Sequence, residues 1–178
     1  KISDVNPQQE EFLWGTKELY SWTSLDGRKL EGLLIKPANF DPNKKYPMIV
    51  NFYEKSSQRL YNHHIPEAHR STVDYHYYSS NGYIIFNPDV YYKEGYPGES
   101  AFNCVMPGVS QLIEEGFVDE NAIAAQGHSW GGYQVAYLAT RTNLFAAIES
   151  GAPVVNMFSA YGGIRNWSGR NRSFQYEH

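Results

Sequence analysis

The segment GHSWGG (127–132) contains a pattern that could hold a serine nucleophile. It matches G-x-S-x-G, a tight turn from a strand into a helix that leaves the hydroxyl of Ser129 exposed above the sheet. The apolar run AIAAQ precedes it as a strand, and helical spacing follows it. A Cβ at Gly127 or Gly131 would clash in so sharp a turn, while Gly132 lets the helix start approach closely. The alternative is a glycine-rich helix start that packs on a strand and does no chemistry.

A serine needs a histidine to accept its proton and an acid to orient that histidine. In α/β-hydrolases the acid and then the histidine follow the serine along the chain. After Ser129 the sequence contains Glu149, Glu177 and His178 and no aspartate. Glu149 lies in a predicted strand. Glu177 and His178 are neighbours in the sequence, and a carboxylate is poorly placed to orient the histidine that directly follows it. His128 is placed to shape the turn rather than to act as the base. The residues after Ser129 therefore offer no evident pair of base and acid for it.

Other chemistries find weaker support. No short metal-ligand spacing occurs, so we expect no metal and no cofactor. The net charge of −4 and the pI near 5.9 argue against nucleic acid as a partner, and no apolar run reaches the ~20 residues of a membrane span. The single cysteine excludes an internal disulfide and leaves the compartment open; we expect it to be a small buried hydrophobe. We expect polar loops in place of a metal site at His63, His64, His69, Asp74 and His76, and in place of a nucleic-acid patch at Arg165, Trp167, Arg170, Arg172, Phe174 and Tyr176. The cysteine is Cys104.

The order of the predicted elements indicates an α/β fold. An Asp-Gly turn within residues 25–28 joins two extended runs and predicts an antiparallel hairpin. Short apolar strands follow, and helical segments lie between them. This alternation favours a mostly parallel sheet with chemistry at the carboxyl ends of its strands. The strands are expected at 48–53, 83–86, 122–126 and 144–149, and the helices at 102–113, broken near Pro107-Gly108, and at 131–141, with Val135, Leu138 and Ala139 facing inward.

The segment GFVDENAIAAQGHSWGGYQVAYLATRTNLFAAIESGAPV (116–154) resembles the catalytic domain of the prolyl oligopeptidase family of serine peptidases, on its dipeptidyl-peptidase and acylaminoacyl-peptidase side. The resemblance extends to residues 22–37, 46–58 and 89–100, and so covers most of the chain. It implies an α/β-hydrolase fold, cut off before its last strands. It also implies that the catalytic acid and histidine lie beyond residue 178, so we expect the isolated chain to be nearly inactive. Residues 16–178 would be this partial peptidase domain, and residues 1–15 an arm from a preceding β-propeller.

The resemblance also implies roles for particular residues. The oxyanion hole would consist of the backbone N–H of Trp130 and the hydroxyl of Tyr53; the alternative for Tyr53 is an aromatic ring that caps the strand. Val154, Met157 and Tyr161 would line the pocket for the residue before the scissile bond, although ordinary packing explains them equally well.

Together these features predict a serine peptidase that hydrolyses short peptides through an acyl-enzyme on Ser129. An esterase of the same fold and a non-catalytic binding fragment are the alternatives. The expected partners are a peptide substrate, the β-propeller and the remainder of the hydrolase domain. We also expect the isolated chain to self-associate through the open edge of its last predicted strand.

Overall fold

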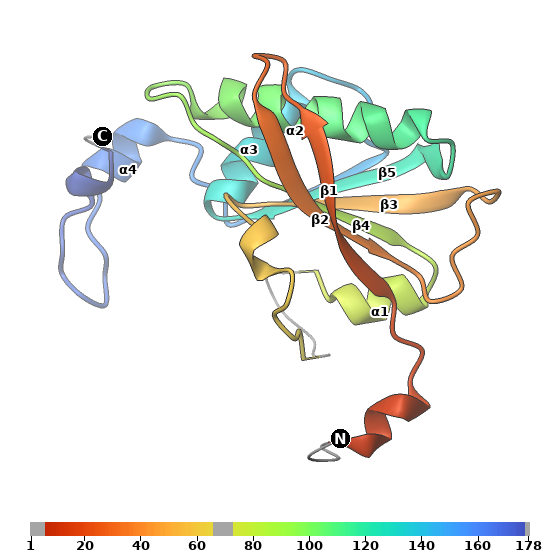
Figure 1. The fold of residues 1–178 in the computed structure, drawn as a ribbon. Coiled ribbons are helices and arrows are strands. Elements are labelled where there is room, and N and C mark those ends of the chain that lie inside the picture. The colour runs from red at the N-terminus through yellow and green to blue at the C-terminus, as the bar shows by residue number, and fades with distance from the viewer. Residues whose placement is uncertain (1–5, 66–72, 177–178) are drawn as a thin grey trace.

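The computed structural model describes residues 6–65 and 73–176, and its centre is a six-stranded sheet (Figure 1). The strand order is β1-β2-β4-β3-β5-β6. The strands are β1 (Thr16–Thr23), β2 (Lys29–Lys36), β3 (Tyr46–Asn51), β4 (Ile84–Pro88), β5 (Val118–His128) and β6 (Ala147–Gly151). The helices are α1 (Tyr75–Ser80), α2 (Pro97–Glu114), α3 (Trp130–Ala139) and α4 (Met157–Tyr161), with 3₁₀ turns η1 (Pro7–Glu11), η2 (Ser57–Arg59) and η3 (Ser173–Gln175).

The strand directions confirm the predicted sheet, which is mostly parallel with an antiparallel hairpin at its N-terminal end. β1 and β2 form the antiparallel hairpin, and β2 also pairs antiparallel with β4. The pairs β3–β4, β3–β5 and β5–β6 are all parallel. The carboxyl ends of β3, β4 and β5 therefore meet at one edge of the sheet, where an α/β fold places its site.

Helices cover both faces of the sheet. Helices α2 and α3 lie over one face and α1 over the other (Figure 1). The larger core forms under α2 and α3, and a smaller cluster around Leu33, Ile35 and Ile85 faces α1. The apolar strands β3 and β4 are thus covered on both sides, which explains why their sequences do not alternate.

The expected break at Pro107-Gly108 is wrong, because α2 runs without interruption from Pro97 to Glu114. A proline inside a helix costs about 3 kcal/mol. Buried residues on both sides of it, Val105, Val109 and Leu112, each contribute roughly 1.5–3 kcal/mol when fully buried, and together they outweigh that cost.

Three amide side chains connect the carboxyl ends of the central strands. Asn87 Nδ2 on β4 donates to Asn51 Oδ1 on β3 over 2.9 Å, and Asn51 Nδ2 donates in turn to Gln126 Oε1 on β5. We call this set the amide row. It fixes the lateral positions of the strand ends from which the loops of the candidate site leave.

Strand β6 and the segment before β1 lie at the two ends of the described fold. β6 lies at the edge of the described sheet, and Ile148 on it is 37% exposed; self-association through this edge stays a prediction. In the segment predicted as an arm, the ring of Trp14 packs edge-on against His76 at 4.6 Å. Within the described ranges, no helix has both the length and the apolar character to span a membrane.

Candidate active site

Ser129 occupies the turn between β5 and α3 in a strained backbone conformation. Its φ of 59° and ψ of −112° lie in a region that residues other than glycine rarely adopt. Its backbone N–H donates to the carbonyl of Gly151 at the end of β6 over 2.7 Å, and its carbonyl accepts from Tyr133 N–H on α3 over 3.1 Å. The neighbouring strand and the following helix thus hold the strained residue from both sides.

The glycines around Ser129 are required by close backbone contacts. A Cβ at Gly127 would lie 2.3 Å from the carbonyl oxygen of Gly131, and a Cβ at Gly131 would lie 2.5 Å from the carbonyl oxygen of Phe52. A Cβ at Gly132 would lie 2.8 Å from the carbonyl oxygen of Gly151. Real Cβ atoms do not approach backbone this closely, so these positions accept only glycine without a shift of the turn.

Replacing Gly127 with alanine is expected to destabilise the protein by about 2 kcal/mol, the usual scale of an overpacked site. Urea unfolding followed by circular dichroism measures the change. Gly162→Ala is the matched control, since a Cβ there meets nothing closer than 3.7 Å and the φ of −79° suits any residue. A Gly127→Ala variant as stable as the Gly162→Ala variant would contradict the described geometry.

Trp130 is the first residue of α3, so its backbone N–H has no partner inside the helix and is available to an acceptor. Its ring stacks on Tyr133 at 5.0 Å and meets the ring of Tyr92 edge-on at 6.4 Å. These contacts fix the start of the helix beside Ser129; the role of this N–H in an oxyanion hole stays a prediction.

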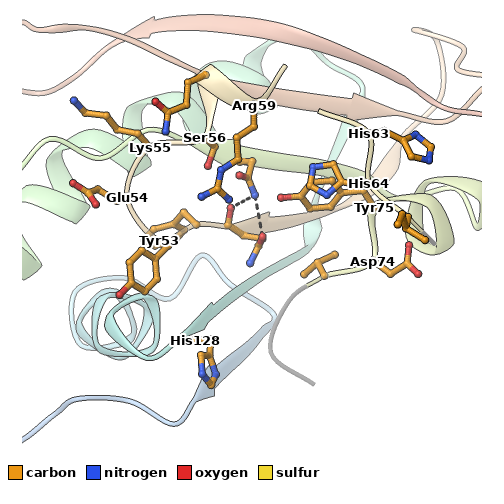
Figure 2. Close-up of a pocket in the computed structure, with 16 residues that line it drawn as sticks. Tyr53, Glu54, Lys55, Ser56, Arg59, His63, His64, Asp74, Tyr75 and His128 are labelled. Atoms are coloured by element: carbon orange, nitrogen blue, oxygen red, sulfur yellow. Dashed lines mark hydrogen bonds between the residues drawn. The ribbon is translucent and has the colours of Figure 1, made fainter. Parts of the chain in front are cut away.

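Tyr53 follows β3, and its Cα lies beside the start of α3, 3.7 Å from where a Cβ at Gly131 would be. Its side chain is one of those that line the cleft in Figure 2. The side chain is 51% exposed, but its backbone is fixed. The carbonyl oxygen of Tyr53 accepts from Gln134 Nε2 over 2.7 Å and from the Tyr92 hydroxyl over 2.8 Å. Burial raises the pKa of Tyr92 well above its ordinary value.

The buried carboxylate of Asp89 holds the rest of this loop. It accepts from the backbone N–H of Ser56 over 2.5 Å, from that of Ser57 over 2.9 Å, and from the Ser57 hydroxyl over 2.5 Å. Val90 N–H donates to the carbonyl of Glu54 over 2.7 Å. The sequence reasoning missed Asp89, although a polar residue directly after a buried strand is a recognisable signal for this edge of a sheet.

Gln134 is the second residue that the sequence reasoning missed. Its side chain is fully buried on α3, where it donates to the carbonyls of Tyr53 and Trp130. Val135 and Leu138 face inward as expected, but the expectation for Ala139 is wrong, since it is exposed at the helix end. The inward face of α3 therefore includes Gln134 and not Ala139. The sequence signal for Gln134 was a single polar side chain in an otherwise apolar helix.

Two cavities adjoin these residues. A cleft of about 740 Å³ is lined by Tyr53, His63, His64 and His128, among others (Figure 2). A second cavity of about 480 Å³ is lined by Ser129 and the segment after β6. Tyr53 and Ser129 thus line two different cavities.

One of the three predicted pocket residues lines the cavity beside Ser129. Val154 lines the cavity beside Ser129, whereas Met157 and Tyr161, both on α4, do not line it. Helix α4 is short, and Tyr161 is 47% exposed on it.

No hydrogen bond joins the Ser129 hydroxyl to a histidine within residues 6–65 and 73–176. His128 lines the cleft that contains Tyr53, not the cavity that contains Ser129. His63 and His76 pack with Trp14, and His76 Nε2 bonds the carbonyl of His64 over 2.6 Å. No group of three potential metal ligands occurs in the described ranges. The candidates His69, Glu177 and His178 lie outside the described residues.

The chain is similar in sequence to known proteins. The family model described as "Prolyl oligopeptidase family" matches residues 71–173. The chain is 30% identical over 131 residues to the "probable dipeptidyl-aminopeptidase B" of Penicillium rubens, a match that covers 65% of this chain and 14% of that protein. It is 28% identical over 150 residues to mouse dipeptidyl peptidase 8, covering 77% of this chain and 17% of that protein.

A solved structure shares the fold. The acylaminoacyl peptidase of Pyrococcus horikoshii superposes with a TM-score of 0.67 at 19% identity, over 90% of this chain and 27% of that one. The chain thus spans less than a third of the length of each of these three relatives. The neighbouring structures have the α/β-hydrolase fold that the sequence predicts.

Proposed function

This chain belongs to the prolyl oligopeptidase family, and we propose that it is the nucleophile-bearing part of a serine peptidase that hydrolyses short peptides. The observation that carries this proposal is the conformation of Ser129: φ is positive, the turn connects a parallel strand to a helix, and the flanking glycine backbones touch. Strain of about 1–3 kcal/mol at a single residue is retained in proteins mainly where it positions a functional group.

In this mechanism, Ser129 Oγ attacks the carbonyl carbon of the scissile bond, and its proton passes to a histidine. The negative charge that develops on the carbonyl oxygen is stabilised by Trp130 N–H and the Tyr53 hydroxyl. The histidine then gives its proton to the leaving amine, and water releases the acyl group from Ser129. We place that histidine and its acid after residue 178, since the order Ser, acid, His is the order of the fold.

The arrangement of the longer protein is part of the same proposal. Residues 1–15 would connect a preceding β-propeller to the peptidase domain, which begins at residue 16 and continues past residue 178. The propeller would restrict entry to short peptides. The small share of each curated relative that this chain covers is consistent with such additional parts.

A fluorophosphonate probe tests the proposal. In the intact protein we expect stoichiometric labelling at Ser129, located by peptide mapping, together with hydrolysis of short peptidyl anilides. The isolated chain of 178 residues, which lacks the proposed base, should react at most slowly. Turnover of aryl esters without any turnover of anilides would instead establish an esterase, and an intact protein with neither labelling nor turnover would be a binding module.

A further inference from the structure

The cavity beside Ser129 has a positively charged lining. Two half-buried arginines, Arg165 and Arg172, line it, and no carboxylate does so among the residues that the structure describes. The rest of its lining is apolar or neutral and includes Pro153 and Val154. Its walls therefore combine a small apolar surface with an excess of positive charge.

The two arginines come from opposite arms of one loop. Ile164 and Asn171 form an antiparallel bridge. Arg165 N–H donates to the carbonyl of Arg170, and Arg172 N–H donates to the carbonyl of Gly163, each over 3.0 Å. This loop follows α4 and projects away from the sheet (Figure 1). The backbone pairing holds the two arginines on facing arms of the loop without using their side-chain donors.

Within the described residues, the guanidinium groups have only neutral partners. Arg165 Nη2 donates to Gln175 Oε1 over 3.0 Å, and Arg172 Nη2 donates to the Tyr176 hydroxyl over 3.2 Å. Arg172 Nε is buried and has no acceptor in the described part of the chain. An arginine presents five donors in a planar fork that suits a carboxylate, so most of this capacity is unused here.

From this arrangement we propose that the cavity lined by Ser129, Arg165 and Arg172 binds a carboxylate of the peptide, carried by a residue adjacent to the scissile bond. The inference rests on the proposed function and adds a substrate class to it. The carboxylate belongs either to the side chain of an acidic residue or to the C-terminus of the peptide. Both are planar anions that can take paired hydrogen bonds from a guanidinium.

Two matched pairs of substrates test the proposal on the intact protein. The first pair is a short peptidyl-glutamyl anilide and its glutaminyl counterpart, which has the same shape without the charge. The second pair is a neutral tripeptide with a free C-terminus and the same peptide as its amide. We expect kcat/KM to favour the carboxylate member of one pair by about tenfold, the scale of a hydrogen bond to a charged group. The pair that shows the preference identifies the source of the carboxylate.

Variants connect this preference to the arginines. In Arg172→Met and in Arg165→Met the ratio of the two kcat/KM values should fall toward one, and Arg172→Lys should retain part of it. Arg170→Met is the control, because Arg170 is on the same loop and does not line the cavity. It should leave the ratio unchanged.

The outcomes separate the two proposals. Peptide hydrolysis that depends on Ser129 but shows no preference within either pair would overturn the carboxylate site and leave the peptidase intact. If Arg172→Met and Arg165→Met lower kcat/KM equally for both substrates of a pair, these arginines are structural. That result would also overturn the carboxylate site. A protein that hydrolyses none of the four substrates and is not labelled at Ser129 would overturn the proposed function itself.

Discussion

The Ser129→Gly variant of the intact protein is expected to be inactive and yet more stable than the natural protein. Activity should fall about 10⁴- to 10⁶-fold in kcat, because the group that forms the acyl-enzyme is removed. Stability should rise by about 1 kcal/mol, because glycine adopts a φ of 59° and a ψ of −112° without the penalty that serine bears there. The two effects are measured by peptidyl anilide turnover and by urea unfolding.

Ser129→Ala is the control that separates the two effects. It removes the hydroxyl but keeps the Cβ, so it should lose as much activity as Ser129→Gly without the gain in stability. If both variants unfold at the same urea concentration as the natural protein, the strain assigned to position 129 is not present. Residual activity above about 1% in either variant would mean that the nucleophile lies elsewhere.

Tyr53→Phe is expected to lower kcat by about 10²- to 10³-fold with little change in KM, the usual effect of removing one donor of an oxyanion hole. The substitution preserves the ring. It also preserves the hydrogen bonds from Gln134 and Tyr92, because these are accepted by the backbone carbonyl of Tyr53. A loss of activity would therefore report the hydroxyl alone. Steady-state kinetics with a peptidyl anilide measures it.

Tyr96→Phe is the matched control for that measurement, since Tyr96 is a similarly exposed tyrosine that precedes α2 and lines neither cavity beside the turn. Its activity should equal that of the natural protein. If Tyr53→Phe is equally active, Tyr53 is the aromatic cap of its strand, which was the alternative interpretation of the sequence.

The parts of the fold that local chemistry determines could be predicted from the sequence. The Asp-Gly turn specifies the hairpin of β1 and β2, and the glycines of 127–132 specify the sharp turn at Ser129. The continuity of α2 through Pro107 could not be predicted in this way. It depends on how much apolar surface the flanking turns bury against the sheet, and that is a property of the tertiary structure.

The supports of the candidate site were predicted least well. Gln134 lies on an apolar helix, and its role depends on the proximity of two carbonyls, one of which belongs to a distant loop. Asp89 acts on backbone N–H groups that lie about thirty residues earlier. Short-range periodicity contains no information on such contacts. Which residues of α4 reach the cavity beside Ser129 depends on the direction of the helix in the same way, and the assignment of Met157 and Tyr161 to the substrate pocket stays a prediction.

The amide row has a consequence for how this edge of the sheet can change during evolution. Its hydrogen bonds all run in one direction, from Asn87 through Asn51 to Gln126. An aspartate at position 51 could still accept from Asn87 but could no longer donate to Gln126, and turning one carboxamide around would bring like groups face to face. Positions 51, 87 and 126 should therefore covary among homologues, while the loops that begin beside them remain free to diverge in length and sequence.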